Sequence, residues 1–431
     1  MELLLKDGIL PNGSTSDIRI EGEIITELGQ ALSSAGEVIN CKGLRILPGF
    51  VDLHTHLREP GRENAETVLT GSRAAIRGGF TAISPMANTS PVADSAGVVE
   101  QVWRLGREAG LCDVFPIGAV SEGLEGKQLS EMKAMADSAA QVRVFSDDGK
   151  CVSDSLLMRR ALEYVKSFGG VIAQHAQDPR LTEGAQMNEG IVSSQLGLAG
   201  WPAIAEESII ARDILLAHSI GSRLHICHLS TKGSVEIIRW AKSQGMQVTA
   251  EVTPHHLLLT DETARTYDPI YKVNPPLRTD EDVKALRAAL ADGTIDIVAT
   301  DHAPHPTEDK DCEWAAAAFG MVGLETALGI VITTMIETGL MDWPRLVEVM
   351  SVSPAKIGGY ISHGMDLKKG SVANIAIVDP SKKWTVDREL LHSKSKNTPF
   401  HGWQLIGDVI HTIFNGKVVM RNHNLIGVSN E

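Results

Sequence analysis

The chain has 431 residues, of which 43% are hydrophobic, and its 40 Lys and Arg against 54 Asp and Glu give a formal net charge of −14. A chain of this length can bury a large core, and its acidic balance argues against a nucleic-acid or anionic-membrane partner, which would require clustered basic residues. No apolar run reaches about 18 residues, so we expect no membrane-spanning helix.

Residues 1–48 are expected to form short strands joined by hairpin turns. The strand-like segments are ELLLKDGIL, DIRIEGEIITEL and GEVINCKGLRIL. This flank is too short to bury a hydrophobic core that would be stable alone.

Residues 49–362 repeat one pattern, in which a short apolar run is followed by a polar turn and an amphipathic helical segment. The expected strands lie in LRILPGFVDLHTH, GGFTAISPMANT, CDVFPIGAV, QVRVFSDDG, GGVIAQHAQD, SRLHICHLST, QVTAEVTPHH and DIVATDHAPH. Several helical segments have Ser or Asp near the start and Gly just past the end, as SDSLLMRRALEYVKSFG does. Eight such units predict an α/β fold of the (β/α)8 TIM-barrel type. A doubly wound open sheet is the alternative, but no GxGxxG follows the first strand.

Residues 363–431 return to short strands, in GSVANIAIVDP and HTIFNGKVVMRN. Asn415-Gly416, between the last two strand-like runs, predicts a type I′ hairpin. Because neither flank suffices for a core, we expect 1–48 and 363–431 to pair into one small composite β-sandwich domain beside the 49–362 barrel.

The N-terminal segment and the cysteines both indicate a cytoplasmic protein. The first residues, MELLLKDGILPNG, lack the basic region and the long apolar region of a secretory signal. The five cysteines lie far apart with no CxxC pair, which suits reduced thiols better than a disulfide framework.

Side chains that bind metals or transfer protons stand at the C-terminal ends of the expected strands, where barrels build their active sites. The first strand ends in His54 and His56, and residues i and i+2 of a strand point to the same side, so two imidazoles can converge on one ion. Four more strands end in Asp147-Asp148, His175, His228 and Asp301. A lone histidine at a strand end is usually structural, but ligand types on five strands indicate a centre for two Zn²⁺ ions, which accept nitrogen and oxygen donors.

The other histidines are interpreted as structural or surface residues. His255-His256 is ambiguous, with a structural or supporting role favoured, and His302 should point away from the site because it follows Asp301. Six further histidines lack a place at a strand end: His218, His225, His363, His392, His411 and His423.

Polar residues near the same rim are candidates for substrate binding. Arg58 and Asn88 could hold a carboxylate or a ring amide, although a surface ion pair and a turn are the competing interpretations. Asn274 and His305 are similar candidates. We interpret 306–318 as a lid or a pocket wall.

Taken together, these motifs resemble the dihydroorotases of the amidohydrolase superfamily, in particular the bacterial class I branch. The resemblance rests on DLHTHLREPG, GGFTAISPMANT, FSDDG, QHAQD, HICHLSTKGSVE, VTPHHLLLT, KVNPPLR, ATDHAPH, FGMVGLETAL and SKSKNTPFHGW, and it extends from about residue 45 to residue 420. HxHxRE followed by ATDHAPH is its most specific part. One departure is Ala318, where proline is expected.

The resemblance implies a binuclear zinc centre in which His54, His56 and Asp301 hold one ion, His175 and His228 hold the other, and Asp148 and a hydroxide bridge them. It also implies that Asp301 is the catalytic acid–base residue. The substrate contacts that it implies are His56, Arg58, Asn88, Asn274, His305, Phe319 and Gly320.

The implied activity is the zinc-dependent reversible cyclisation of N-carbamoyl-L-aspartate to (S)-dihydroorotate plus water, the third step of pyrimidine (UMP) synthesis. The implied partners are this small-molecule substrate and further copies of the chain in a homo-oligomer, and an association with aspartate carbamoyltransferase stays open.

Two alternatives remain. Another cyclic amidohydrolase, of the dihydropyrimidinase, hydantoinase or allantoinase type, would leave Arg58 without a ring carboxylate to bind. A non-catalytic dihydroorotase-like scaffold subunit should have lost some of the metal ligands, all of which are present here.

Overall fold

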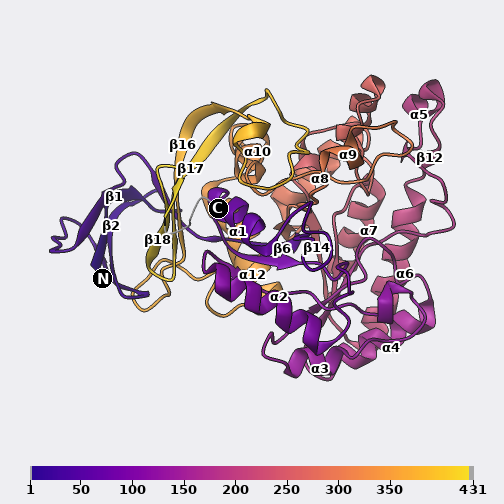
Figure 1. Ribbon diagram of the computed structural model, residues 1–431, viewed down its shortest axis with the longest axis horizontal. Helices are drawn as coiled ribbons and strands as arrows, with labels where there is room; N and C mark the ends of the chain where they lie inside the picture. Colours follow the sequence, from indigo (N-terminus) through magenta and orange to yellow (C-terminus); the bar gives the residue numbers. More distant parts are fainter. Residues whose placement is uncertain (1, 427–431) are drawn as a thin grey trace.

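The computed structural model describes residues 2–426 and places a parallel β-barrel beside a separate, largely antiparallel sheet (Figure 1). The barrel strands are β6 (Phe50–Thr55), β7 (Phe80–Pro85), β8 (Asp113–Val114), β9 (Val144–Phe145), β10 (Val171–Gln174), β13 (Leu224–Ile226), β14 (Val248–Val252) and β15 (Ile297–Val298). They form two parallel sheets, in the orders β6-β7-β8 and β15-β14-β13-β10-β9. Parallel bridges between Gly118 and Phe145 and between Thr55 and His302 join these sheets at both edges. The predicted eight-stranded closed barrel is therefore confirmed.

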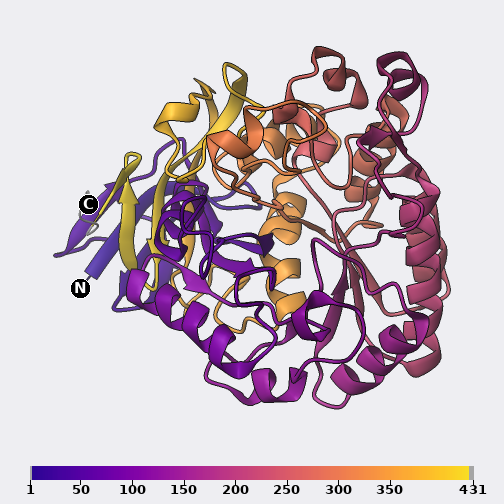
Figure 2. The ribbon, with the colours of Figure 1, turned by 45° about the vertical axis from the view of Figure 1, so that its right-hand side comes forward.

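Helices surround the barrel, as Figure 2 shows. The α-helices are α1 (Val68–Arg77), α2 (Ala96–Ala109), α3 (Met132–Asp137), α4 (Ser155–Lys166), α5 (Ile191–Leu196), α6 (Ile204–Ile220), α7 (Lys232–Ser243), α8 (Asp280–Asp292), α9 (Thr307–Lys310), α10 (Ala327–Val331), α11 (Trp343–Val347) and α12 (Ser353–Gly358). Two π-helical turns, η5 (Ile332–Ile336) and η6 (Glu348–Val352), continue α10 and α11. Short 3₁₀ turns lie at η1 (Glu122–Leu124), η2 (His255–Leu257), η3 (Asp261–Thr266), η4 (Pro269–Tyr271) and η7 (Arg388–Leu390).

The ends of these helices follow the local sequence signals. The Asp154 side chain accepts a hydrogen bond from the Leu157 N–H at the start of α4. Gly221 ends α6 and Gly293 ends α8, both in the left-handed conformation that costs glycine least. Capping residues thus mark the start of α4 and the ends of α6 and α8, and each of these helices is followed by the next barrel strand.

The flanking segments share one nine-stranded sheet, in the order β19-β18-β17-β16-β5-β1-β2-β3, with β4 paired to β1. Its strands are β1 (Glu2–Ile9), β2 (Thr15–Glu21), β3 (Ile24–Gly29), β4 (Glu37–Asn40), β5 (Arg45–Pro48), β16 (Ile375–Thr385), β17 (Gln404–Phe414), β18 (Lys417–Arg421) and β19 (Asn424–Leu425). A separate two-stranded sheet, β11 (Met187–Asn188) with β12 (Gly200–Trp201), lies between β10 and β13 in the sequence.

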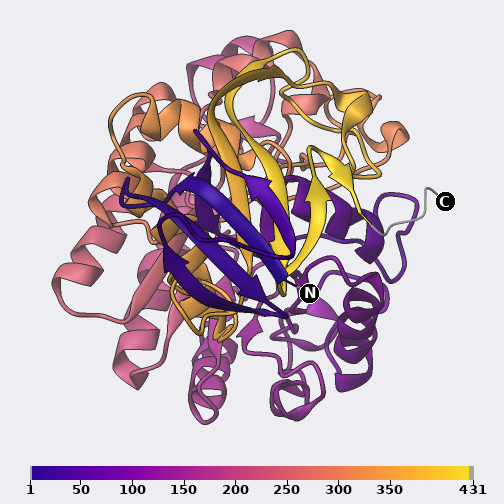
Figure 3. The ribbon, with the colours of Figure 1, turned by 90° about the vertical axis from the view of Figure 1, so that its left-hand side faces the viewer.

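Pairing between the two ends of the chain holds this sheet together. β5 of the N-terminal flank pairs antiparallel with β16 of the C-terminal flank, and Figure 3 shows the indigo and yellow strands side by side. Asn415 and Gly416 both have positive φ, 48° and 72°, as the type I′ hairpin between β17 and β18 requires. The pairing of the flanks is confirmed, whereas the domain boundaries at 48/49 and 362/363 stay a prediction.

No helix within residues 2–426 combines the length and the apolar character needed to cross a bilayer.

Candidate metal centre and substrate cavity

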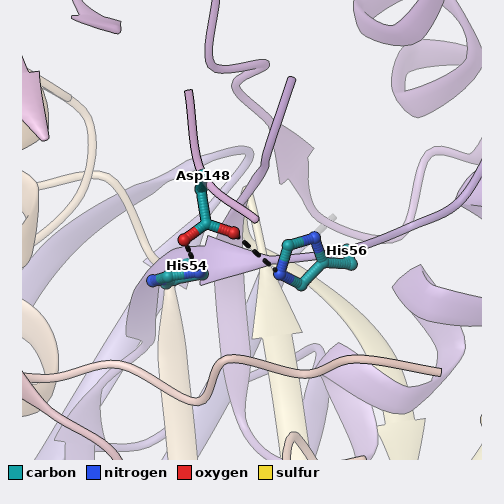
Figure 4. A group of neighbouring side chains, drawn as sticks. All are labelled: His54, His56 and Asp148. Carbon is teal, nitrogen blue, oxygen red and sulfur yellow. Dashed lines mark ion pairs between the residues drawn. The ribbon is translucent and has the colours of Figure 1, made fainter. Parts of the chain in front are cut away.

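The first strand of the barrel delivers two imidazoles to one carboxylate. His54 Nε2 lies 3.4 Å from Asp148 Oδ1, and His56 Nε2 lies 3.4 Å from Asp148 Oδ2 (Figure 4). Asp301, just beyond β15, closes this side of the site, with its Oδ1 3.0 Å from His56 Nε2 and 3.5 Å from His54 Nε2. All four side chains are buried.

A second pair of imidazoles meets the same carboxylate from β10 and β13. His175 Nδ1 lies 3.1 Å from Asp148 Oδ1, and His228 Nε2 lies 3.3 Å from it. These two ring nitrogens are 2.9 Å apart. Asp148 therefore lies between two pairs of histidines that come from opposite sides of the rim.

The donor atoms fit metal ions. Within residues 2–426, three sets of side chains have ligand atoms that all lie within 4.8 Å of one another. Two of them, His54–His56–Asp148 and Asp148–His175–His228, share Asp148, and the third is His54–Cys227–Glu251. Within the described part of the chain, the buried His54 Nε2 has no hydrogen-bond partner, although it faces two carboxylates. Nitrogen donors with carboxylate oxygens are a set that Zn²⁺ accepts.

The electrostatics keep both carboxylates ionised but act differently on the imidazoles. Burial opposes a charge on His54, yet Asp148, Glu251 and Asp301 raise its pKa well above the usual value, and Asp148 likewise raises the pKa of the buried His175. Burial lowers the pKa of His56, which keeps the imidazole neutral. Burial alone would raise the pKa of Asp301, but the neighbouring His54 and His56 lower it to about 2. Burial also opposes ionisation of Asp148, yet the surrounding histidines hold its pKa well below the usual value.

Asp147 points away from this centre. Its Oδ1 accepts hydrogen bonds from the backbone N–H groups of Val120, at 2.8 Å, and Ser121, at 2.9 Å, while its Oδ2 accepts from the Ser121 hydroxyl. Of the two adjacent aspartates, Asp148 is therefore the one aimed at the histidines.

Three residues of the rim have left-handed backbone conformations that non-glycine residues seldom adopt. The φ angles are 62° at Arg58, 31° at His228 and 46° at Asp301. Such conformations cost about 1–3 kcal/mol each and gather at functional sites. They turn these side chains inward at the ends of their strands.

A cavity of about 220 Å³ opens above the histidines. Its walls are His56, Arg58, Asn88, Asp148, Gly149, His175, His228, Asn274, Asp301, Ala303, His305, Phe319 and Gly320. Every predicted substrate contact thus borders the same space as the predicted metal ligands. His54 lies beneath it, fully buried. The ligand and substrate roles themselves stay predictions.

Hydrogen bonds orient the side chains of this wall. His56 Nδ1 donates to Asn88 Oδ1 at 2.9 Å, which leaves Nε2 for the centre. Arg58 Nε donates to the Pro304 carbonyl at 3.0 Å, and His305 Nε2 donates to the Phe319 carbonyl at 2.8 Å. Burial, reinforced by Arg58, lowers the pKa of His305 to about 2, so this ring is neutral.

Two histidines of the barrel rim, His302 and His256, lie outside the metal centre. His302 points away, as expected: its Nε2 lies 3.3 Å from Glu66 Oε2, and its Nδ1 accepts the Gly323 N–H. His256 lies between Thr253 and the Pro275 carbonyl, as a structural role requires.

Two residues that form hydrogen bonds to site residues from outside the cavity were not predicted from the sequence. Glu251 of β14 bonds to His54, and Asn397 of the C-terminal flank bonds to the backbone of His305. Glu251 left one signal, since it is a carboxylate inside a strand whose other residues are uncharged. Asn397 lies in the SKSKNTPFHGW motif, to which no role had been given.

Comparisons with known proteins agree with this geometry. A family model described as Dihydro-orotase-like matches residues 43–234. A protein named dihydroorotase from Streptomyces coelicolor is 64% identical over 418 residues, which covers 97% of this chain and 98% of its own. A protein of the same name from Mycobacterium tuberculosis is 53% identical over 426 residues and covers 98% and 99%.

Solved structures share the architecture. L-Hydantoinase (dihydropyrimidinase) from Arthrobacter aurescens superposes with a TM-score of 0.86 at 27% identity, covering 98% of this chain and 97% of its own. Dihydropyrimidinase from Brevibacillus agri gives 0.85 at 23% identity, with 99% and 96% covered, and supports the fold alone. The barrel, its rim and these relatives define a metal-dependent cyclic amidohydrolase. The chain belongs to the dihydroorotase family.

Proposed function

We propose that this chain catalyses the zinc-dependent, reversible cyclisation of N-carbamoyl-L-aspartate to (S)-dihydroorotate plus water in pyrimidine synthesis. One observation carries the proposal: a single carboxylate, Asp148, lies between two pairs of imidazoles beneath a cavity whose wall holds Arg58. The near full-length similarity to proteins named dihydroorotase supports the substrate.

The centre would hold two zinc ions. His54, His56 and Asp301 would bind one ion, His175 and His228 the other, and Asp148, which faces both pairs of histidines, would serve both sites. When bound, the zinc ions would polarise the substrate carbonyl and lower the pKa of water to about 7.

Asp301 is the proton carrier in this proposal. Because its pKa is about 2, the carboxylate is ionised at neutral pH and can accept a proton. In ring opening it takes a proton from the attacking water and delivers it to the ring nitrogen that leaves. In ring closure the same oxygen moves the proton the other way.

The cavity wall orients the substrate. The Arg58 guanidinium would pair with the substrate carboxylate, helped by Asn88 and by the neutral His305. Asn274, Phe319 and Gly320, which also line the cavity, would confine the substrate ring. Holding the ring in attack geometry supplies part of the rate by proximity.

A second candidate is a dihydropyrimidine or hydantoin amidase, favoured by the similarity to the L-hydantoinase structure. Those substrates carry no ring carboxylate, so the buried Arg58 would face the cavity without a counter-charge. A non-catalytic scaffold is disfavoured because the six ligand-type side chains all converge.

The test combines zinc content with turnover of the purified chain. Two zinc ions per chain and hydrolysis of dihydroorotate would support the proposal. Hydrolysis of dihydrouracil or hydantoin alone would favour the second candidate, and neither zinc nor turnover would favour the scaffold. Because ring closure turns a carboxylate into a neutral amide and consumes a proton, the equilibrium must shift to dihydroorotate at lower pH. A ratio independent of pH would contradict the reaction.

We further propose that the chain acts in the cytoplasm as a homo-oligomer, with aspartate carbamoyltransferase as a candidate partner. Light scattering measures the assembly. Full turnover by the zinc-loaded chain alone would show that the partner is not required.

A further inference from the structure

Glu251 is a buried carboxylate beneath the metal centre whose two oxygens together face three donors. Its Oε1 accepts the Nδ1–H of His54 at 2.6 Å and the backbone N–H of His228 at 3.1 Å. Its Oε2 lies 3.0 Å from Nε2 of His225, whose Nδ1 lies 2.9 Å from the Thr249 hydroxyl. Glu251 is only 1% exposed, so water does not compete for these bonds.

The bond to His54 determines which ring nitrogen of this histidine is free. A carboxylate at 2.6 Å accepts a hydrogen, so the proton of the neutral ring resides on Nδ1. Nε2 then presents its lone pair toward Asp148 (Figure 4) and toward Asp301, whose Oδ1 lies 3.5 Å away. A carboxylate behind a metal-binding imidazole fixes the tautomer, orients the ring and raises its basicity.

The bond to His228 acts on the backbone. This residue has a φ of 31°, in a region that residues other than glycine seldom adopt. Its N–H is held by the same Oε1 atom that holds His54. Releasing this bond would free the backbone to relax and would turn the imidazole away from Asp148.

We propose that Glu251 is a positioning residue that couples the two metal sites, because one of its oxygens orients a ligand from each. Since it is none of the proposed ligands and does not border the cavity, it acts only through His54 and His228. The inference rests on the proposed binuclear function and deepens it. Its consequence is that loss of the Glu251 carboxylate weakens zinc binding at both sites together.

The test is a competition titration of metal-free protein with zinc and a chromophoric chelator, which resolves the two binding steps. Glu251→Gln keeps the size of the side chain but replaces the charged Oε1 acceptor of His54 and His228 with a neutral amide oxygen, so both bonds weaken. The amide NH₂ can still donate to a re-tautomerised His225. We expect both zinc affinities to fall about 10–100-fold, the usual effect of removing such a supporting group. The urea midpoint of the metal-free variant should stay close to that of the wild type.

Two variants serve as controls. Asp17→Asn removes a buried carboxylate that accepts two backbone N–H groups in the flanking sheet, far from the rim, and should leave both zinc affinities unchanged. His225→Gln removes a Glu251 partner that is no proposed ligand. If Glu251 served only to hold β13 through His225, this variant would weaken zinc binding as much as Glu251→Gln does, and the proposal would be overturned.

The outcomes separate this inference from the function beneath it. If the wild type fails to bind two zinc ions, the proposed function fails and the inference falls with it. If the wild type binds two and Glu251→Gln binds them equally well, or loses affinity at one site only, the coupling is overturned while the function stands. Should Glu251→Gln not fold, nitrogen-15 spectra of labelled histidine in zinc-loaded wild type decide: a His54 ring with its proton on Nδ1 supports the proposal, and one with its proton on Nε2 overturns it.

Discussion

Asp147 and Asp148 are neighbours in the chain with opposite roles in the structure, and this makes them a matched pair. Asp148 contacts four imidazoles, whereas Asp147 holds the backbone of 120–121. We expect Asp148→Asn to change metal content and Asp147→Asn to change stability alone.

The stability effect at Asp147 can be worked from its hydrogen bonds. In Asp147→Asn, the remaining oxygen can still accept both backbone N–H groups, and the new amide can donate to the Ser121 hydroxyl. A bond to a charged acceptor contributes about 1.5–3 kcal/mol and a neutral one about 0.5–1.5 kcal/mol, so two weakened bonds cost about 2 kcal/mol. Burial raises the pKa of Asp147, which shows that its charge is costly to bury, so this value is an upper limit.

The assay measures zinc per chain after gel filtration and urea unfolding of the metal-free variants. Asp147→Asn should retain two zinc ions and lose up to about 2 kcal/mol of unfolding free energy. Asp148→Asn should lose at least one zinc ion, because a neutral amide offers one oxygen where a bridging carboxylate offers two. Zinc loss confined to Asp147→Asn would refute the reasoning.

Three further predictions concern the proposed proton carrier Asp301, the wall of the cavity and the 306–318 segment. Asp301→Asn should retain metal and lose most turnover, since an amide accepts no proton; a near-normal rate would remove its acid–base role. Asn397→Asp replaces the Nδ2 group, which donates to the Ala303 and Gly320 carbonyls, with an acceptor. We expect KM to rise roughly tenfold, which corresponds to about 1.4 kcal/mol, while the zinc content stays the same. An unchanged KM would contradict this prediction. Burial lowers the pKa of Lys310 from 10.5 to about 7, so between these values the unfolded chain binds more protons and native stability rises with pH. Urea unfolding across this range should show the rise in wild type and not in Lys310→Met, whereas parallel curves would show that the native Lys310 titrates normally.

The barrel and most of its rim were predictable because they depend on local order. Alternating short apolar runs and amphipathic helices leave few topologies, and a parallel barrel places every strand end on one rim. His54 and His56 were identified by strand parity alone, since His54 lies in the extended β6 and His56 follows directly after its last residue, Thr55. Once the rim is formed, ligand residue types at strand ends must converge.

Strand parity does not predict the direction of a side chain where the backbone is no longer extended. The choice between Asp147 and Asp148 came from resemblance, because the chain bends directly after β9. His228 and Asp301 point inward only through left-handed backbone conformations at the ends of their strands. Such conformations are stabilised by tertiary hydrogen bonds, as the Glu251 bond to His228 N shows, and local sequence does not encode them.

Glu251 and Asn397 escaped prediction for a related reason: both reach the site by bonding to backbone groups. Every residue but proline has a backbone N–H, so sequence alone does not reveal which one a distant side chain will hold. Asn397 comes 92 residues after His305 and accepts its N–H while donating to the Ala303 and Gly320 carbonyls. Here a segment of the C-terminal flank supports the substrate wall of the barrel. The flank that completes the sheet with β1–β5 therefore also completes the site, and a barrel cut at residue 362 would retain every proposed metal ligand while losing the side chain that holds His305 in place.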